Sequence, residues 1–404
     1  MDAQASASPP AAAPAAPSAH GRFLGESHQY WRILSRDAVQ LIATLGLYRF
    51  WVASDIRRYL WSNTEIAGDE LEYTGDPLEL LVGFLLLVVI LCPLFAASSI
   101  VVLSSGQIVI ASLFNYAAIV CLVPIALLAL YQARRYRLSH TIFRGLRFRQ
   151  TGSAWIYALR TILWFIVNVL TIGLTYPLAR KSLERYKMRH VFYGDVQGDF
   201  QGAAGHLFKT GFILWLVVLG PAVWLFFSGL SKPGITEAES TRTLAAVGGW
   251  IVFAGLVVYP GFHAAVLRWR IGGMRFGTLT LAAPFSTWSL YKAYFRFLGL
   301  MVLLAIVVAA VYALLQFKIL PALPTNPSRL LELIGVILRA ASYFIILTVI
   351  AFAYQATVRF TLWRLIVNAL TLTGIDALDR AKAPAGWSPH HEGRIGGALN
   401  IGGF

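Results

Sequence analysis

Six long apolar stretches constrain this chain more than any other feature. Each has about 20 or more residues with few charges, the length that a helix needs to cross the roughly 30 Å hydrocarbon core of a bilayer. They cover residues 78–103, 108–131, 207–230, 244–267, 297–320 and 332–354. Because they come in three pairs with short linkers, we expect three transmembrane helical hairpins.

The composition supports a membrane protein. The chain is 57% hydrophobic and 13% charged, whereas a soluble domain is roughly 45–50% apolar and about 25% charged. These values exclude a disordered chain and make a nucleic-acid-binding module or a cytosolic enzyme a poor fit. The net charge of +15 comes from basic residues between the apolar stretches. We therefore expect cytoplasmic loops that contact anionic headgroups, and no nucleic-acid partner.

Two further stretches are ambiguous. Residues 31–53 contain three charged side chains, and residues 161–178 are interrupted by Asn168, Gly173 and Pro177. If neither stretch crosses, 24 basic residues lie in the connections and tails on one side of the membrane and three on the other. This asymmetry favours six spans plus two interfacial or re-entrant segments, with both termini in the cytoplasm. Eight spans is the alternative.

We therefore predict an all-α polytopic membrane protein with three regions. Residues 1–21 are rich in Ala and Pro and predict a disordered tail. Residues 22–382 form the transmembrane domain, which is built from internal repeats. Residues 383–404 are rich in Gly and predict a second flexible tail.

The most specific signal is self-similarity of the pattern R-Y-x2-S-[NH]-T-x3-G-x5-T-G. A weaker third copy begins at Arg185 and Tyr186, and a degraded fourth copy at Arg268. The two full copies contain Arg58, Tyr59, Thr64, Gly68 and Gly75, and then Arg135, Tyr136, Thr141, Gly145 and Gly152.

Each copy follows an apolar or mixed segment at the expected cytoplasmic boundary. An Arg-Tyr pair suits a helix end at the headgroups, and the glycine that follows suits a turn. Leu71 and Tyr73 alternate with polar residues, as in a short strand. The copies are interpreted either as structural anchors or as loops that converge on a cytoplasmic vestibule.

Three segments also resemble a known family. ATLGLYRFW at residues 43–51, RRYLWSNTEIAGDELEYTGDPLELL at 57–81 and RYRLSHTIFRGLRF at 135–148 are similar to the YjgN family of bacterial inner-membrane proteins, domain of unknown function 898. The resemblance covers roughly residues 22–380. It implies a multi-pass protein of the bacterial inner membrane and brings no substrate, catalytic residue or cofactor. The long Ala/Pro tail and the degraded fourth copy depart from the family pattern.

Ionisable and polar residues inside apolar segments are candidates for a polar pathway, because such groups need a partner or water. The candidates are Arg339, His263, Asn168 and Arg160. Arg339 and Arg160 could instead reach the headgroups, and His263 could be a core residue. Six carboxylates between residues 65 and 79 lack the spacing of a calcium loop, and we interpret them as a solvated acidic face.

The sequence contains no HExxH, P-loop, GxSxG or CxxC motif. We therefore expect no enzyme and no catalytic, metal-binding or cofactor-binding residues. The leading hypothesis is a transporter, channel or sensor of a small solute or lipid. The alternative is a scaffold or assembly factor whose basic loops bind anionic lipid or a partner protein, and a membrane-bound lipid enzyme is a weaker third option. A homo-oligomer or a membrane-protein partner is compatible with either of the first two.

Overall fold

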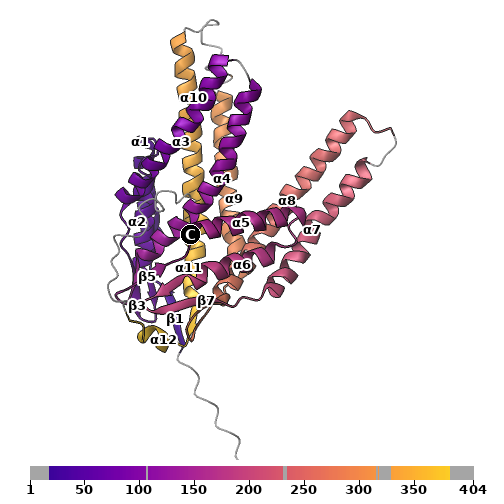
Figure 1. The fold of residues 1–404 in the computed structure, drawn as a ribbon. Helices are drawn as coiled ribbons and strands as arrows, with labels where there is room; N and C mark the ends of the chain where they lie inside the picture. The colour runs from indigo at the N-terminus through magenta and orange to yellow at the C-terminus, as the bar shows by residue number, and fades with distance from the viewer. Residues whose placement is uncertain (1–17, 106–107, 231–233, 315–316, 318–328, 383–404) are drawn as a thin grey trace, which may run out of the picture.

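The molecule has a small β-barrel at one end, from which long helices extend (Figure 1). The computed structural model describes residues 18–105, 108–230, 234–314, 317 and 329–382. The first described strand begins at Ser18, inside the segment 1–21 for which a disordered tail was expected. Residues 1–17 and the predicted tail 383–404 lie outside the described residues.

Ten short antiparallel strands form a closed barrel in the order β1-β10-β9-β8-β7-β6-β5-β4-β3-β2. The barrel closes where the two ends of the chain meet, because His20 pairs with Thr371. The strands are β1 (Ser18–Phe23), β2 (Thr64–Ile66), β3 (Asp69–Tyr73), β4 (Thr141–Phe143), β5 (Leu146–Gln150), β6 (Val191–Tyr193), β7 (Val196–Phe200), β8 (Met274–Phe276), β9 (Leu279–Ala282) and β10 (Thr371–Thr373).

Two-residue turns connect the strands of each hairpin. Ala67 and Gly68 join β2 to β3 with φ values of 54° and 90°, and Arg144 and Gly145 join β4 to β5 with φ values of 49° and 73°. Positive φ at both central residues is typical of the type I′ turn, which matches the twist of the flanking strands. The motif glycines Gly68 and Gly145 therefore occupy turn positions that disfavour other residues.

Pairs of helices alternate with the hairpins along the chain. Helices α2, α4, α6 and α8 each lead directly into a hairpin, and α11 leads into β10. The helices are α1 (Ser27–Ala43), α2 (Arg49–Ser62), α3 (Pro77–Ser105), α4 (Ile108–Ser139), α5 (Ala154–Leu170), α6 (Tyr176–Arg189), α7 (Ala204–Leu230), α8 (Glu237–Gly273), α9 (Thr287–Leu314), α10 (Arg329–Tyr354), the π-helical turn η3 (Gln355–Arg359), α11 (Phe360–Asn368) and α12 (Asp376–Asp379).

The long helices form two groups. Helices α3, α4, α9 and α10 extend together from the barrel, whereas α7 and α8 form a separate hairpin that leans away (Figure 1). Helices α5 and α6 run across the direction of the α3–α4 hairpin, and α5 packs against α4. The longest helix, α8, begins with a capping box in which Thr236 and Glu239 bond each other's backbone N–H groups.

The prediction of an all-α protein with six to eight spans is wrong. Ten strands form the barrel, and within the described residues four helices are long and apolar enough to cross a membrane: Ala204–Gly229, Glu237–Gly273, Thr287–Leu314 and Leu333–Asn368. Two other predicted spans, 78–103 and 108–131, lie in α3 and α4, which are helices of 29 and 32 residues. The end of the predicted span 297–320 lies outside the described residues.

Both ambiguous segments contain a break. Residues 44–48 separate α1 from α2, and residues 171–175 separate α5 from α6. At each break a residue pair with positive φ follows a threonine: Leu45 and Gly46 in the first, Ile172 and Gly173 in the second. A left-handed pair of this kind ends a helix, so neither segment is a continuous span.

Apolar side chains fill the barrel. Phe143, Tyr193, Leu279 and Leu372 are buried in one cluster, which also contains Leu378 from the short helix α12. Helix α12 lies at the hairpin end of the barrel (Figure 1). Its Asp379 pairs with Arg144 of the β4–β5 turn. The described part of the barrel interior is therefore a packed core, closed at this end.

Candidate functional site

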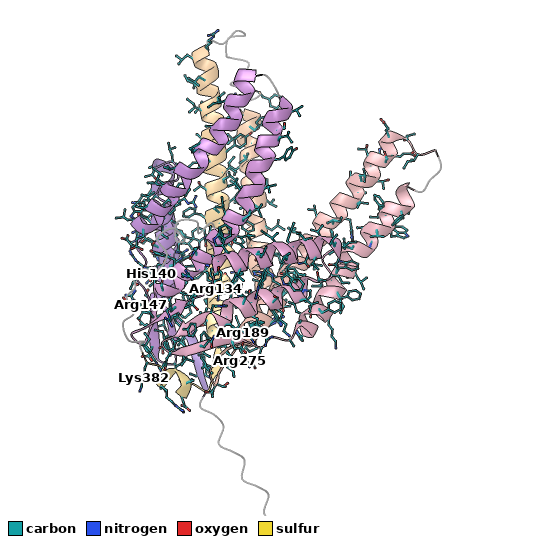
Figure 2. All side chains as sticks on the ribbon, in the orientation of Figure 1. Arg134, His140, Arg147, Arg189, Arg275 and Lys382 are labelled. Carbon is teal, nitrogen blue, oxygen red and sulfur yellow. The ribbon has the colours of Figure 1, made fainter. Side chains whose placement is uncertain are left out.

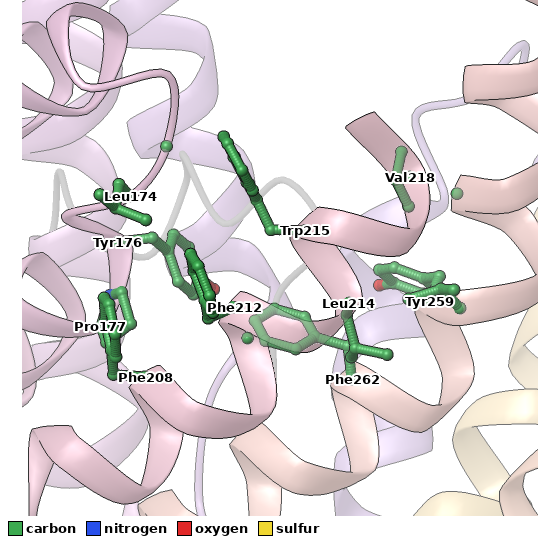
Figure 3. A pocket seen from close by; sticks show the side chains of 14 residues that line it. Leu174, Tyr176, Pro177, Phe208, Phe212, Leu214, Trp215, Val218, Tyr259 and Phe262 are labelled. Carbon is green, nitrogen blue, oxygen red and sulfur yellow. The ribbon is translucent and has the colours of Figure 1, made fainter. Parts of the chain in front are cut away.

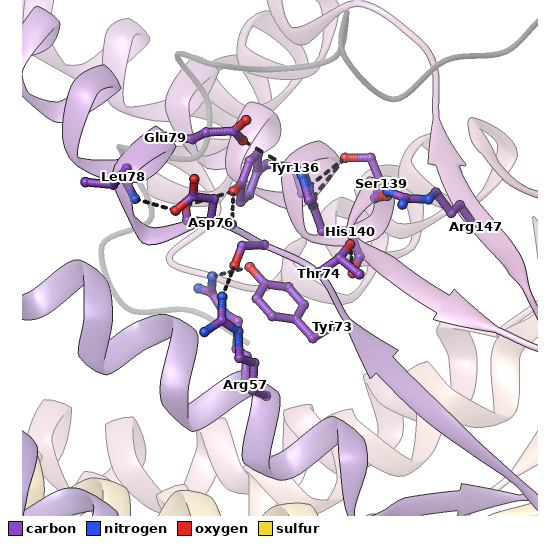
Figure 4. Close-up of polar contacts among 12 residues, drawn as sticks. Arg57, Tyr73, Thr74, Asp76, Leu78, Glu79, Tyr136, Ser139, His140 and Arg147 are labelled. Carbon is purple, nitrogen blue, oxygen red and sulfur yellow. Dashed lines mark hydrogen bonds and ion pairs between the residues drawn. The ribbon is translucent and has the colours of Figure 1, made fainter.

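Two tyrosines of the repeated motif form hydrogen bonds with the backbone at the junction between a hairpin and the helix that follows it. The Tyr136 hydroxyl accepts a hydrogen bond from the Asp76 N–H and donates one to the Asp76 carbonyl, both at 3.1 Å (Figure 4). Tyr186 makes the same two contacts with Ser153, at 3.1 and 2.8 Å. Asp76 and Ser153 lie immediately before α3 and α5. Each tyrosine therefore ties the end of a helix to the start of the helix that precedes it in the chain.

Two motif arginines donate hydrogen bonds to backbone carbonyls where a hairpin ends. Arg58 donates to the Gly75 carbonyl at 3.1 Å, and Arg135 donates to the carbonyls of Gly152 at 2.7 Å and Gln150 at 2.9 Å. Together with the tyrosine contacts, these bonds form what we call the clasps.

The remaining motif residues are also structural. Thr64 and Thr141 accept hydrogen bonds from the indole N–H groups of Trp363 and Trp61, at 3.0 and 3.1 Å. Tyr59 donates to a backbone carbonyl just before α1, at 2.7 Å. The contacts account for the motif as an anchor. That the segments are copies of one another remains a prediction from the sequence.

A cavity of about 280 Å³, which we call the chamber, lies where the helix ends meet the barrel. Trp61 and Trp363 line it as a stacked pair with ring centroids 4.7 Å apart. Phe148 and Phe276 line it from the barrel strands β5 and β8. Arg134, which also lines the chamber, lies at the junction of the helices and the barrel (Figure 2).

Two arginines of α4 supply the positive charge of the chamber wall. Arg134 donates to the Gln150 side-chain oxygen at 3.1 Å and contacts the Met188 sulfur at 3.7 Å, so its partners are neutral. The Arg137 guanidinium makes no hydrogen bond or ion pair within the described part of the chain. Three residues apart, the two side chains lie on one face of α4.

Three more basic residues surround this pair, and among the described residues a single carboxylate pairs with two of them. Glu184 forms ion pairs with Lys187 at 2.6 Å and with Arg270 at 3.3 Å, and its side chain is only 3% exposed. Arg57 is buried and donates to the Tyr73 hydroxyl at 3.0 Å (Figure 4). Positive charge therefore exceeds negative charge around the chamber, on side chains that are buried or half-buried.

The pKa values follow from this excess. Burial, together with the charges of Arg57 and Arg134, lowers the pKa of Arg137. Burial, with the charges of Arg270 and Arg134, also lowers the pKa of Lys187 to about 7, against the opposing effect of Glu184. Burial alone would raise the pKa of Glu184, but Lys187, Arg270 and Arg134 lower it to about 2. The carboxylate stays charged, and the cations are poorly compensated.

The four candidate pathway residues lie in different places. Arg339 is exposed on the surface of α10. His263 lies 3.3 Å from the Tyr294 hydroxyl, between α8 and α9. Asn168 accepts a hydrogen bond from the Thr175 hydroxyl within the α5–α6 turn, at 3.0 Å, and Arg160 lies 4.8 Å from the centre of the Tyr186 ring. The described structure brings none of the four into the chamber.

Sequence analysis missed the chamber residues, although a signal for them was present. Arg134 lies two residues before a motif tyrosine, and Arg137 and Lys187 each follow one directly. Arg270 follows Trp269, which bonds the carbonyl of Ala203 before α7 as the tyrosines bond theirs. Charges at matched positions beside the clasp residues would have identified a common inner surface.

The described residues contain no group of three or more His, Cys, Asp and Glu side chains that could hold a metal ion. No curated protein and no solved structure matches the chain. A family model described as "Bacterial protein of unknown function (DUF898)" matches residues 18–259, more than half of the sequence. The match confirms the resemblance carried by the motifs. The chain belongs to the DUF898 family, the YjgN-like proteins of bacteria.

Proposed function

We propose that this chain is a multi-pass protein of the bacterial inner membrane that binds a small anion in the chamber, as the recognition step of transport or sensing. The observation that carries the proposal is the Arg137 guanidinium, which lines a cavity beside Arg134 and has no protein partner in the described residues. A half-buried guanidinium without a hydrogen-bond or ion-pair partner among the described residues is available to an anion. A bound anion would supply the missing partner.

The size and lining of the chamber suit a small ligand. A volume of about 280 Å³ is at the low end for ligand sites, which are commonly about 300–1,000 Å³. The stacked Trp61–Trp363 pair and the barrel phenylalanines give one side of the chamber an apolar lining. Guanidinium groups in such surroundings bind phosphate and carboxylate through charge-assisted hydrogen bonds.

The packed barrel favours binding over conduction. Phe143, Tyr193 and Leu372 occupy its interior, and α12 covers its hairpin end. An ion that reached the chamber could therefore not continue through the barrel. This arrangement supports a transporter or sensor over an open channel.

The proposed topology adds α3 and α4 to the four helices that meet the criteria for spans. Their lengths of 29 and 32 residues suffice for crossing. Both termini and the barrel would lie in the cytoplasm, because basic residues concentrate on the barrel side of the helices.

The test measures anion binding by the purified full-length chain in detergent, with orthophosphate, sulfate and succinate as probes. Arg137→Met removes the charge and keeps a long side chain. We expect it to weaken binding of the preferred anion by at least about tenfold, which corresponds to roughly 1.4 kcal/mol. The matched control is Arg22→Met, an exposed residue of β1, which should leave the affinity unchanged.

Equal affinities of the full chain, Arg137→Met and Arg22→Met for every anion that binds would contradict the chamber site. The alternative of a scaffold whose basic loops hold a partner would then become the leading hypothesis.

A further inference from the structure

A second basic site lies on α5 and α6, away from the chamber. A groove of about 630 Å³ runs between the two helices, and we call it the α5–α6 groove. Its basic residues come from α5, from α6 and from the residue that directly follows α6. None of the described residues that line it is acidic. These basic residues are Arg160, Lys181, Arg185, Arg189 and His190.

Two of these cations are free to bind a ligand. Arg185 stands at the motif position where Arg58 and Arg135 form clasps, yet it is exposed and has no hydrogen bond or ion pair to any described residue. Lys181 likewise has no such partner in the described chain. Arg189, in contrast, pairs with Asp199 at 3.3 Å. The groove therefore keeps uncompensated positive charge along α6.

Helix α5 forms the other wall of the groove with Ile156, Arg160 and Trp164, and beside the groove it carries an exposed apolar surface. Helix α5 has 17 residues, and many of its large apolar side chains face outwards. Trp155 and Phe165 are each 67% exposed, and Leu170 is 77% exposed. Helix α5 is too short to span a membrane, and the chain turns into α6 at residues 171–175. It lies across the α3–α4 hairpin (Figure 1), the orientation of a helix in the plane of a membrane interface.

Apolar space adjoins the groove. A pocket of about 320 Å³ lies between the start of α6 and the α7–α8 hairpin (Figure 3). Leu174, Tyr176 and Pro177 line it, and the next residue, Leu178, lines the α5–α6 groove. Phe208 and Phe212 of α7 complete a nearly polar-free wall.

We propose that the α5–α6 groove binds the headgroup of an anionic phospholipid, with α5 embedded in the interface and the acyl chains against its exposed apolar side chains. Positive charge beside an apolar surface matches both ends of such a lipid. Arg160 extends over the Tyr186 ring, and its charged end would lie at headgroup level. The site is separate from the chamber, since Lys181 and Arg185 do not line that cavity.

The experiment titrates delipidated, full-length protein in detergent with phosphatidylglycerol or phosphatidylcholine and counts bound lipids by native mass spectrometry. In the double variant Lys181→Gln/Arg185→Gln, we expect phosphatidylglycerol to bind at least about tenfold more weakly. Phosphatidylcholine should bind weakly to both proteins. The matched control is Arg380→Gln/Lys382→Gln, which removes two exposed charges at the barrel end of the chain.

Three results would overturn the proposal. The double variant could retain full affinity for phosphatidylglycerol, or phosphatidylcholine could bind as tightly as phosphatidylglycerol. Inorganic phosphate could also displace phosphatidylglycerol at similar concentration, which would assign the groove to a free anion. An unfolding midpoint equal to that of the unsubstituted chain would show that the double variant is folded.

Discussion

The clasps and the chamber use neighbouring residues of the same helix ends in opposite ways. On α4, Arg135 and Tyr136 bond backbone groups at three junction residues. Arg134 and Arg137, on either side of them, have neutral partners or none in the described chain. Successive residues of a helix point about 100° apart. This short segment of α4 therefore forms clasps through one face of the helix and lines a charged cavity with another.

The contacts separate the polar residues that are structural from those that are available to a ligand. A clasp residue has its hydrogen bonds satisfied by backbone, so replacing it should cost stability. A chamber cation lacks a matching charge, so replacing it should gain stability and lose binding. Glu184 is the exception, because it is the carboxylate that compensates the charges of Lys187 and Arg270.

Removal of that carboxylate should have the largest effect. Glu184→Gln removes the buried carboxylate that Lys187 and Arg270 share and leaves the largely buried Lys187 without its ion pair, which should lower the free energy of unfolding by about 3–5 kcal/mol. Denaturant unfolding in detergent measures this. Glu70→Gln, an exposed residue of β3, is the control and should change stability little. A small effect of Glu184→Gln would mean that the chamber cations are already compensated.

Loss of a clasp should have the next largest effect. Tyr136→Phe removes both hydrogen bonds to Asp76 and leaves the ring in place, so we expect a loss of about 1–3 kcal/mol. Tyr186→Phe should behave in the same way at Ser153. Tyr343→Phe, at an exposed tyrosine of α10, serves as the control. Clasp variants as stable as this control would remove the distinction drawn between the two regions.

These contacts also show what the sequence could predict. The described parts of the six apolar stretches lie in helices because apolar length is a local signal, and the short strand expected at Leu71 and Tyr73 is part of β3. Gly68 and Gly145 were expected at turns and occupy them. The motif itself is local as well, but its Arg and Tyr side chains were expected at headgroups, and their backbone partners were not predicted.

The barrel and the chamber are not local. Most strands have only three to five residues, too few for an alternating pattern to stand out. The ladder closes by pairing His20 with Thr371, nearly a whole chain apart. Likewise, the ion pair between Glu184 and Arg270 joins two helices whose proximity only the closed barrel determines. No short window of sequence contains this information.

Replacement of Arg137 should have a smaller effect of opposite sign. Arg137→Met removes an uncompensated charge and fills similar space, so we expect the unliganded protein to gain about 1–3 kcal/mol. The same unfolding measurement checks this, and the variant should also lose the stabilisation that a bound anion gives the full chain. Arg135→Met, a clasp variant, should lose stability instead. A destabilised Arg137→Met would place this side chain with the clasps.

The smallest expected effects are on the pH dependence of stability and of sulfate affinity. Since the folded protein lowers the pKa of Lys187 to about 7, the unfolded chain, where the value is near 10.5, binds more protons between these limits. Stability of the unliganded protein should therefore rise with pH from about 7 towards 10. Sulfate affinity should fall over the same window, because Lys187, whose charge acts on Arg134 of the chamber wall, loses its proton while sulfate does not titrate. Lys187→Met should flatten both trends, whereas Lys181→Met, outside the chamber, should keep them. An affinity that rises with pH in parallel with stability would contradict an anion site beside Lys187, since the proton of Lys187 would then destabilise the occupied chamber as well as the empty one.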